Sequence, residues 1–141
     1  MELKPVRLKV PGRKAIGICI PVLLDNGVGF YCLGLLGSLL VASEFASVRS
    51  ALGKWITLKY LERLKSRKER ESKPDTVLYC SNIKTIHLKT HRLLGLESLE
   101  LKIIDLLDRE YVIGQADTLK EFKETILAIK DHLNSVCRIR E

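Results

Sequence analysis

The chain lacks the short motifs that most enzyme classes and metal sites require. Its 141 residues contain no H-E-x-x-H, no G-x-S-x-G, no C-x-x-C pair and neither of the glycine-rich phosphate loops. Two of its three histidines, His87 and His91, fall on one expected strand, about 13 Å apart, which is too far for both to bind one metal ion. We therefore expect no catalytic residue, no cofactor and no metal site, and a protein that is not an enzyme.

Long uninterrupted hydrophobic runs are also missing. Residues 15–42 carry one charge, that of Asp25, but Pro21 and a D-N-G sequence divide them into shorter pieces. A transmembrane helix needs about 20 continuous apolar residues, so the pattern favours a buried β-hairpin that turns at Asn26-Gly27. A membrane-associated protein that uses 15–42 is the alternative. No secretory leader is recognisable, and we expect a cytoplasmic protein, with peripheral membrane association as a second option.

Cysteine is scarce and widely spaced. The four cysteines stand at positions 19, 32, 80 and 137, and their first interpretation is as small buried hydrophobic side chains. Disulfides are the second interpretation. A two-residue turn at Asn26-Gly27 would place Cys19 opposite Gly34, with Cys32 on the diagonal, so a bridge between the two cysteines is left open.

Basic residues are concentrated in one segment. The formal net charge is +7, and residues 45–75 hold nine basic and four acidic side chains. Apolar residues at helical spacing, with no proline before Pro74, predict a helix there. Its later part, 59–73, has the charge to contact the phosphates of nucleic acid or of anionic lipid, and the alternative is a solvated helix surface. The candidate contact residues are Lys59, Arg63, Lys65, Arg67, Lys68 and Arg70.

Alternating apolar residues predict seven strands around this helix. They are expected at 15–24, 28–36, 39–43, 76–80, 85–92, 99–107 and 111–115, with turns at 95–98 and 108–110. A closing helix follows, because Thr118 and Glu121 have the spacing of a capping box. Its apolar stripe should cover the sheet and consists of Leu119, Phe122, Ile126, Ile129, Leu133 and Val136.

Three stretches of the second half carry a resemblance to a known family: CSNIKTIHL, LELKIIDLLDREYVIG and ADTLKEFKETILAIKDHL. Over residues 76–137 the chain resembles the pleckstrin-homology-like (PH-like) superfold, most closely its GRAM and prokaryotic PH-like members. The resemblance implies an α+β fold in which a seven-stranded antiparallel split barrel is closed by a C-terminal amphipathic helix. The single domain, 1–141, would carry a basic helical insertion, 44–72, between strands 3 and 4.

The same resemblance bears on local structure and on ligands. Ser81-Asn82 would be the kink that leads one strand into the next, with Ile83 and Ile86 anchored in the core. Family members that bind phosphoinositides hold the headgroup with Lys and Arg around the first strand pair. This chain has no basic residue between Lys14 and Arg49, so that mode of binding is not expected.

The expected function is that of a non-enzymatic PH-like binding or adaptor domain that engages a protein or peptide partner. The alternatives are a nucleic-acid-binding protein that uses the basic helix 59–73 and the membrane-associated protein already described. Self-association through the basic helix would make the protein a homo-oligomer. The candidate partner surface consists of Trp55, Leu58, Leu61, His87, Lys89 and His91.

Overall fold

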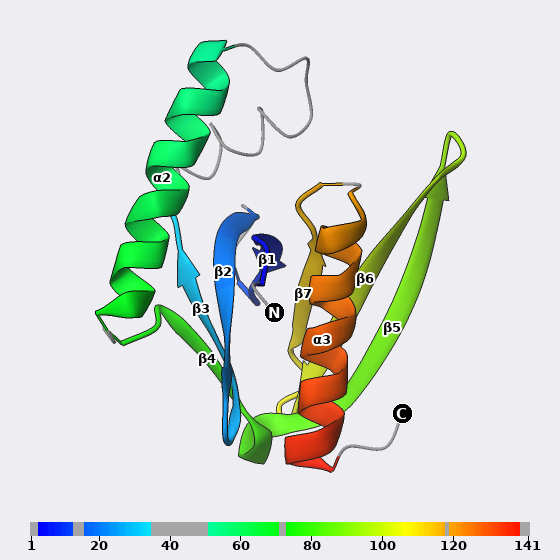
Figure 1. Cartoon of the computed structure of the whole chain (residues 1–141). Helices are drawn as coiled ribbons and strands as arrows, with labels where there is room; N and C mark the ends of the chain where they lie inside the picture. Colours follow the sequence, from blue (N-terminus) through cyan, green and yellow to red (C-terminus); the bar gives the residue numbers. More distant parts are fainter. Residues whose placement is uncertain (1–2, 13–15, 35–50, 71–72, 118, 139–141) are drawn as a thin grey trace.

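The computed structural model describes residues 3–12, 16–34, 51–70, 73–117 and 119–138. Within these ranges the chain forms seven β-strands, two α-helices and one short 3-10 turn, and the protein is therefore of the α+β class (Figure 1). The strands are β1 (Val6–Lys9), β2 (Gly17–Leu24), β3 (Gly27–Cys32), β4 (Thr76–Tyr79), β5 (Ile83–Leu93), β6 (Leu96–Asp105) and β7 (Glu110–Gln115). The helices are α2 (Ala51–Glu69) and α3 (Lys120–Cys137), and the 3-10 turn is η1 (Cys80–Asn82).

All strands pair antiparallel in a single sheet, in the order β4-β3-β2-β1-β7-β6-β5. The prediction of a seven-stranded antiparallel sheet is confirmed. Among the described residues, β4 and β5 lie at the two ends of this sheet and do not pair with each other, so a closed barrel is not shown. In Figure 1 β2, β3 and β4 lie to the left of α3, and β5 and β6 lie to its right.

The first strand, β1, is one that the sequence pattern did not predict. It is only four residues long, and its alternation is clear only in three dimensions, where Val6 and Leu8 are buried and Lys9 is exposed. β1 pairs with β2 on one side and with β7 on the other, so it joins the two halves of the sheet. The strand predicted at 39–43 lies outside the described residues.

The register predicted for the first hairpin was wrong. Leu24 pairs with Gly27, so the turn is formed by Asp25 and Asn26 and not by Asn26-Gly27. The neighbouring strand explains the difference: a Cβ on Gly27 would lie 2.0 Å from the carbonyl oxygen of Leu78 in β4. Only glycine permits this close approach, and Gly27 therefore belongs to the sheet.

The second half of the sheet follows the prediction more closely, with shifted ends. η1 forms the corner between β4 and β5, and Ile83 and Ile86 are buried next to it, which confirms the role expected for Ser81-Asn82. The β5–β6 turn contains only Leu94 and Gly95, so β6 begins at Leu96 and the turn expected at 95–98 was wrong. The β6–β7 turn lies between Asp105 and Glu110, with Asp105 accepting hydrogen bonds from the backbone N–H groups of Leu107 and Arg109.

Helix α3 covers the inner face of the sheet, as its apolar stripe predicted. Ile126, Ile129 and Leu133 are completely buried against strand residues such as Phe30 and Leu101. Burial of each such side chain contributes about 1.5–3 kcal/mol to folding. One detail of the prediction does not hold, because Leu119 is half exposed and precedes the helix as its N-terminal cap residue. Thr118, the first residue of the predicted capping box, lies outside the described residues.

Helix α2 lies on the opposite face of the sheet, against β2 and β3. Leu64 packs on Ile20 and Tyr31, and these side chains alternate along their strands with core-facing neighbours such as Cys19 and Phe30. The predicted helix before the strand at 76–80 is confirmed for Ala51–Glu69. The earlier part of the predicted insertion, 44–50, lies outside the described residues.

Both pairs of cysteines form disulfides, so their interpretation as unbonded hydrophobic residues was wrong. Cys19 and Cys32 are directly opposed on β2 and β3, which the two-residue error in the predicted register had concealed. Cys80 in η1 is bonded to Cys137, the last residue of α3. The second bridge therefore fastens the end of the closing helix to the corner of the sheet.

Within the apolar segment 15–42, the residues Gly17–Leu24 and Gly27–Cys32 form a strand hairpin, as its D-N-G sequence indicated. Its continuation from residue 35 lies outside the described residues. No helix in the described ranges is long and apolar enough to cross a bilayer.

Candidate functional site

In the described part of the chain, the outer face of β1, β7, β6 and β5 is covered by neither helix, and we call it the open sheet face. Strand pairing places Arg7, Gly114, Glu100 and Lys89 in one row across it. A second row runs through Lys9, Val112, Lys102 and His87, and His91 lies beside Ser98. Cations predominate among these side chains, so the open sheet face suits an anionic partner.

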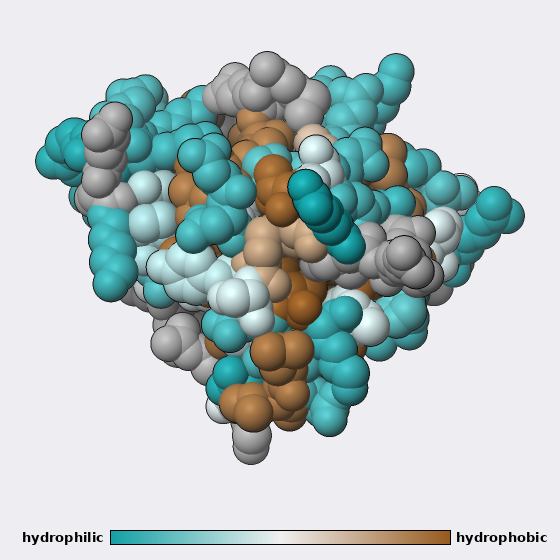
Figure 2. Space-filling view, turned by 90° about the horizontal axis from the view of Figure 1, so that it is seen from below, coloured by the Kyte–Doolittle hydropathy of each residue, from teal (hydrophilic) through white to brown (hydrophobic). Residues whose placement is uncertain are grey.

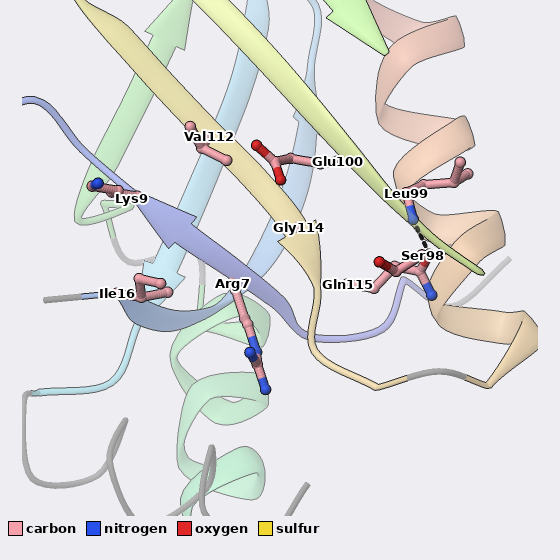
Figure 3. A pocket seen from close by; sticks show the side chains of 9 residues that line it. All are labelled: Arg7, Lys9, Ile16, Ser98, Leu99, Glu100, Val112, Gly114 and Gln115. Atoms are coloured by element: carbon pink, nitrogen blue, oxygen red, sulfur yellow. Dashed lines mark hydrogen bonds between the residues drawn. The ribbon is translucent and has the colours of Figure 1, made fainter. Parts of the chain in front are cut away.

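A shallow cavity of about 230 Å³ lies on this face (Figure 3). Gly114 leaves room there, because a Cβ at this position would meet no atom within 4 Å. Arg7 and Glu100 lie on opposite sides of Gly114. The Nε atom of Arg7 is buried and has no hydrogen-bond partner in the described part of the chain. A guanidinium in this position can hold a carboxylate or phosphate group from a ligand.

Strand β5 forms one end of the sheet and pairs, within the described ranges, only with β6. Its outward-facing side chains His87, Lys89 and His91 are all exposed. The free backbone edge of an 11-residue strand can accept a further strand from another molecule. The three residues predicted from the sequence as part of a partner surface thus lie together along this edge.

The charges beside β5 are only partly balanced within the chain. His91 Nε2 lies 2.8 Å from a carboxylate oxygen of Glu100, and Lys102 Nζ lies 3.2 Å from one of Glu110. Contact with the side chain of Lys102 lowers the pKa of Lys89. Lys89 and Lys102 are therefore two neighbouring cationic groups. A carboxylate from an acidic partner would pair with them and relieve their mutual repulsion.

The other three predicted partner residues lie elsewhere. Trp55 and Leu58 are each 59% exposed on α2, which is on the far side of β1 and β7 from β5 (Figure 1). Leu61 packs against Ile20, Tyr31 and Leu64, so it holds α2 to the sheet and is not a free contact residue. The six residues therefore do not form one surface, because α2 and β5 belong to different ends of the sheet.

Half of the predicted phosphate-binding residues make structural contacts. Arg67 donates two hydrogen bonds to Asp75, of 3.0 and 2.8 Å, and Asp75 also accepts the backbone N–H of Cys32 at 2.7 Å. The hydrogen bond from Arg67 lowers the pKa of Asp75. Lys68 Nζ reaches the carbonyl of Pro21, and Arg70 donates to the carbonyl of Ser66. Arg67 and Lys68 therefore hold α2 in place and Arg70 bonds within the helix end, which weakens the case for a phosphate-tracking helix.

The remaining three cations, Lys59, Arg63 and Lys65, are exposed. Lys59 lies over the ring of Trp55 at 5.0 Å, and Arg63 lies over that of Tyr60 at 5.8 Å. Contacts at this distance are compatible with a cation–π interaction along the helix surface. Both cations stay at the helix surface, and these ring contacts do not bring them together around a groove.

Two apolar surfaces lie outside the open sheet face. Figure 2 shows a band of apolar side chains on the end of the molecule where α3 terminates. At the β6–β7 turn, Leu106 and Leu107 are 60% and 71% exposed.

In the described ranges no three His, Cys, Asp or Glu side chains are close enough together to hold a metal ion.

Sequence reasoning missed Arg7, Glu100, Lys102 and Gly114. Their signal was present as polar positions alternating with apolar ones in V-R-L-K and L-E-L-K-I and as a glycine within a strand. The missing information was which strands lie side by side. β1 and β6 are more than 85 residues apart in the chain, and only β7 between them brings their outer faces together.

Comparison with known proteins adds no relative: no family model matches the chain, and neither a curated protein nor a solved structure matches it.

Proposed function

We propose that this chain is a non-enzymatic, PH-like binding domain that takes an extended acidic segment of a protein partner as an additional strand along β5. The observation that carries the proposal is the outer edge of β5, with which no strand of the described ranges pairs; β5 is an 11-residue end strand with His87, Lys89 and His91 exposed along it. Backbone hydrogen bonds would supply affinity, and the cationic side chains would select for acidic residues.

The charge of β5 also argues against a second copy of the chain at this edge. Pairing of two β5 strands would bring Lys89 and the histidines close to their own counterparts. Like charges on opposed strands are unfavourable, and lysine on an edge strand is a common protection against self-pairing. An acidic strand meets no such penalty.

The PH-like split barrel is part of this proposal. Its support is the chain order, seven strands followed by one closing helix, together with a sheet whose two halves lie on either side of α3 (Figure 1). The cytoplasmic location stays a prediction. Two disulfides are more typical of oxidising compartments, with the proteins of hyperthermophiles as the intracellular exception.

The proposal can be tested with a fluorescein-labelled peptide of alternating Glu and Val, matched in length to the 11 residues of β5. We expect saturable binding by fluorescence anisotropy that weakens as salt is added. The same peptide N-methylated at every residue keeps its charge but has no backbone N–H group to donate to β5, and it should bind at least tenfold more weakly. Equal binding of the two peptides would refute strand addition.

A charge reversal locates the site. Lys89→Glu should raise the Kd roughly three- to tenfold at low salt, because an exposed attraction of about 0.2–1 kcal/mol is replaced by repulsion. Lys73→Glu makes the same charge change at an exposed position before β4, at the other end of the sheet, and should leave the Kd nearly unchanged. If both variants bind alike, the peptide is not held at β5.

A further inference from the structure

The β5–β6 hairpin ends in an exposed apolar turn. Leu94 is 93% exposed and Leu96 is 59% exposed, with Gly95 between them. Leu94 and Gly95 have φ angles of 53° and 79°. We call residues 94–96 the hairpin tip.

The backbone of the tip does not favour the residue that occupies it. Positive φ at both central residues is the type I′ arrangement, in which asparagine or glycine is strongly preferred at the first position. A leucine there is held in the left-handed region at a cost, and its exposed side chain gains almost no packing in return. Folding alone would be better served by Asn-Gly, so the apolar side chain of Leu94 points to a role outside the fold.

The hairpin carries this tip away from the body of the protein. β6 pairs with β7 only from Glu100 onward, whereas β5 and β6 pair as far as Leu93 and Leu96. The last four residues of β5 and the first four residues of β6 therefore form a two-stranded arm, which projects beyond the other strands in Figure 1. The arm is braced beside its tip, where Lys123 Nζ on α3 lies 2.8 Å from a carboxylate oxygen of Glu97.

We propose that the hairpin tip inserts into the interfacial region of an anionic lipid bilayer. Leu94 and Leu96 form a small convex projection, and a fluid bilayer accepts such a projection without a preformed pocket. Arg92 is two residues from Leu94, about 7 Å along the strand, which matches the depth of about 5–10 Å to which interfacial apolar groups are buried. Its side chain is 79% exposed and lies where the phosphates would be.

The charges beside the hairpin tip favour anionic lipid. Arg92 and Lys123 share the single carboxylate of Glu97, at 3.4 and 2.8 Å, so this cluster has one positive charge in excess. Two leucines give only marginal attachment by themselves. Binding should therefore require anionic lipid and should weaken as salt is added.

The test is co-sedimentation of the whole chain with phosphatidylcholine vesicles that contain or lack phosphatidylserine. We expect partition onto the anionic vesicles only. Leu94→Asn should lower the partition coefficient roughly tenfold or more and should at the same time leave Tm unchanged or raise it, because asparagine suits the turn. Leu107→Asn is the matched control: Leu107 is 71% exposed at the opposite end of β6, and its loss should not change partition.

The outcomes separate a lipid contact from a structural role. The proposal is overturned if the chain stays in solution with both kinds of vesicle. The hairpin tip would then be expected to bind in a pocket of a partner protein. Equal losses for Leu94→Asn and Leu107→Asn also overturn it, because binding would then follow general hydrophobicity. A clear fall in Tm for Leu94→Asn overturns the claim that this leucine has no packing role.

Discussion

Removal of the Cys80–Cys137 disulfide is expected to cost more stability than removal of the Cys19–Cys32 disulfide. The two bonds close loops with sequence separations of 57 and 13 residues. In the chain-entropy description, these loops restrict the unfolded chain by about 4 and about 3 kcal/mol respectively. For 141 residues, with an unfolding entropy of about 2.1 cal/mol/K per residue, the Tm should fall by roughly 13 °C and roughly 10 °C.

The assay is thermal unfolding by circular dichroism of two double variants, Cys80→Ala with Cys137→Ala and Cys19→Ala with Cys32→Ala. Alanine avoids placing a hydroxyl at the fully buried position of Cys19. The wild-type chain in a reducing agent should lose at least as much stability as the less destabilised of the two variants. The reasoning is refuted if removal of the 80–137 bond changes Tm by only a degree or two, or if the short loop proves the costlier one to open.

Three further predictions concern contacts that hold the helices and the sheet. Asp75→Asn should cost about 1 kcal/mol, because the pair with Arg67 is partly exposed and its energy is screened by solvent. The pKa of Asp75 is lowered in the folded state, so its contribution is complete above the unfolded value of about 4 and is lost as pH falls through the folded value. The Tm difference between wild type and Asp75→Asn should therefore vanish in strong acid, and a difference that persists there would contradict this assignment. Gly27→Ala should lower stability by about 3 kcal/mol or more in urea unfolding, since the added Cβ meets the Leu78 carbonyl, and a neutral effect would show that β3 and β4 lie farther apart. Ile129→Ala should cost about 2–5 kcal/mol in the same assay, and a loss below 1 kcal/mol would mean that α3 does not cover the core.

Much of the fold could be predicted because its strands and closing helix carry strong local patterns. The stripe from Phe122 to Leu133 repeats at helical spacing, and its burial followed from that repeat. β1 was missed because its four residues, which lie between Pro5 and Pro11, are too few for a period-2 pattern to stand out. The first hairpin was misregistered because the close approach of β4 to Gly27 is a tertiary contact that no local turn rule contains.

The candidate site was predictable only along a single strand. His87, Lys89 and His91 alternate on β5, so their common face follows from the sequence itself. Arg7 could not be connected with Glu100, because that row depends on β1 pairing with β7. The basic run on α2 was overvalued for a related reason. Net charge does not reveal that Arg67 is already paired with Asp75 or that Lys68 reaches the backbone of β2.

Residue-resolved amide hydrogen exchange, with and without the Glu-Val peptide, tests strand addition at β5 most directly. The account predicts that alternate amides between Ile83 and Leu93, those that point away from β6, exchange freely in the unbound chain and become protected when peptide is added. Protection that appears on α2 instead, or amides of β5 that are already protected in the unbound chain, would contradict it.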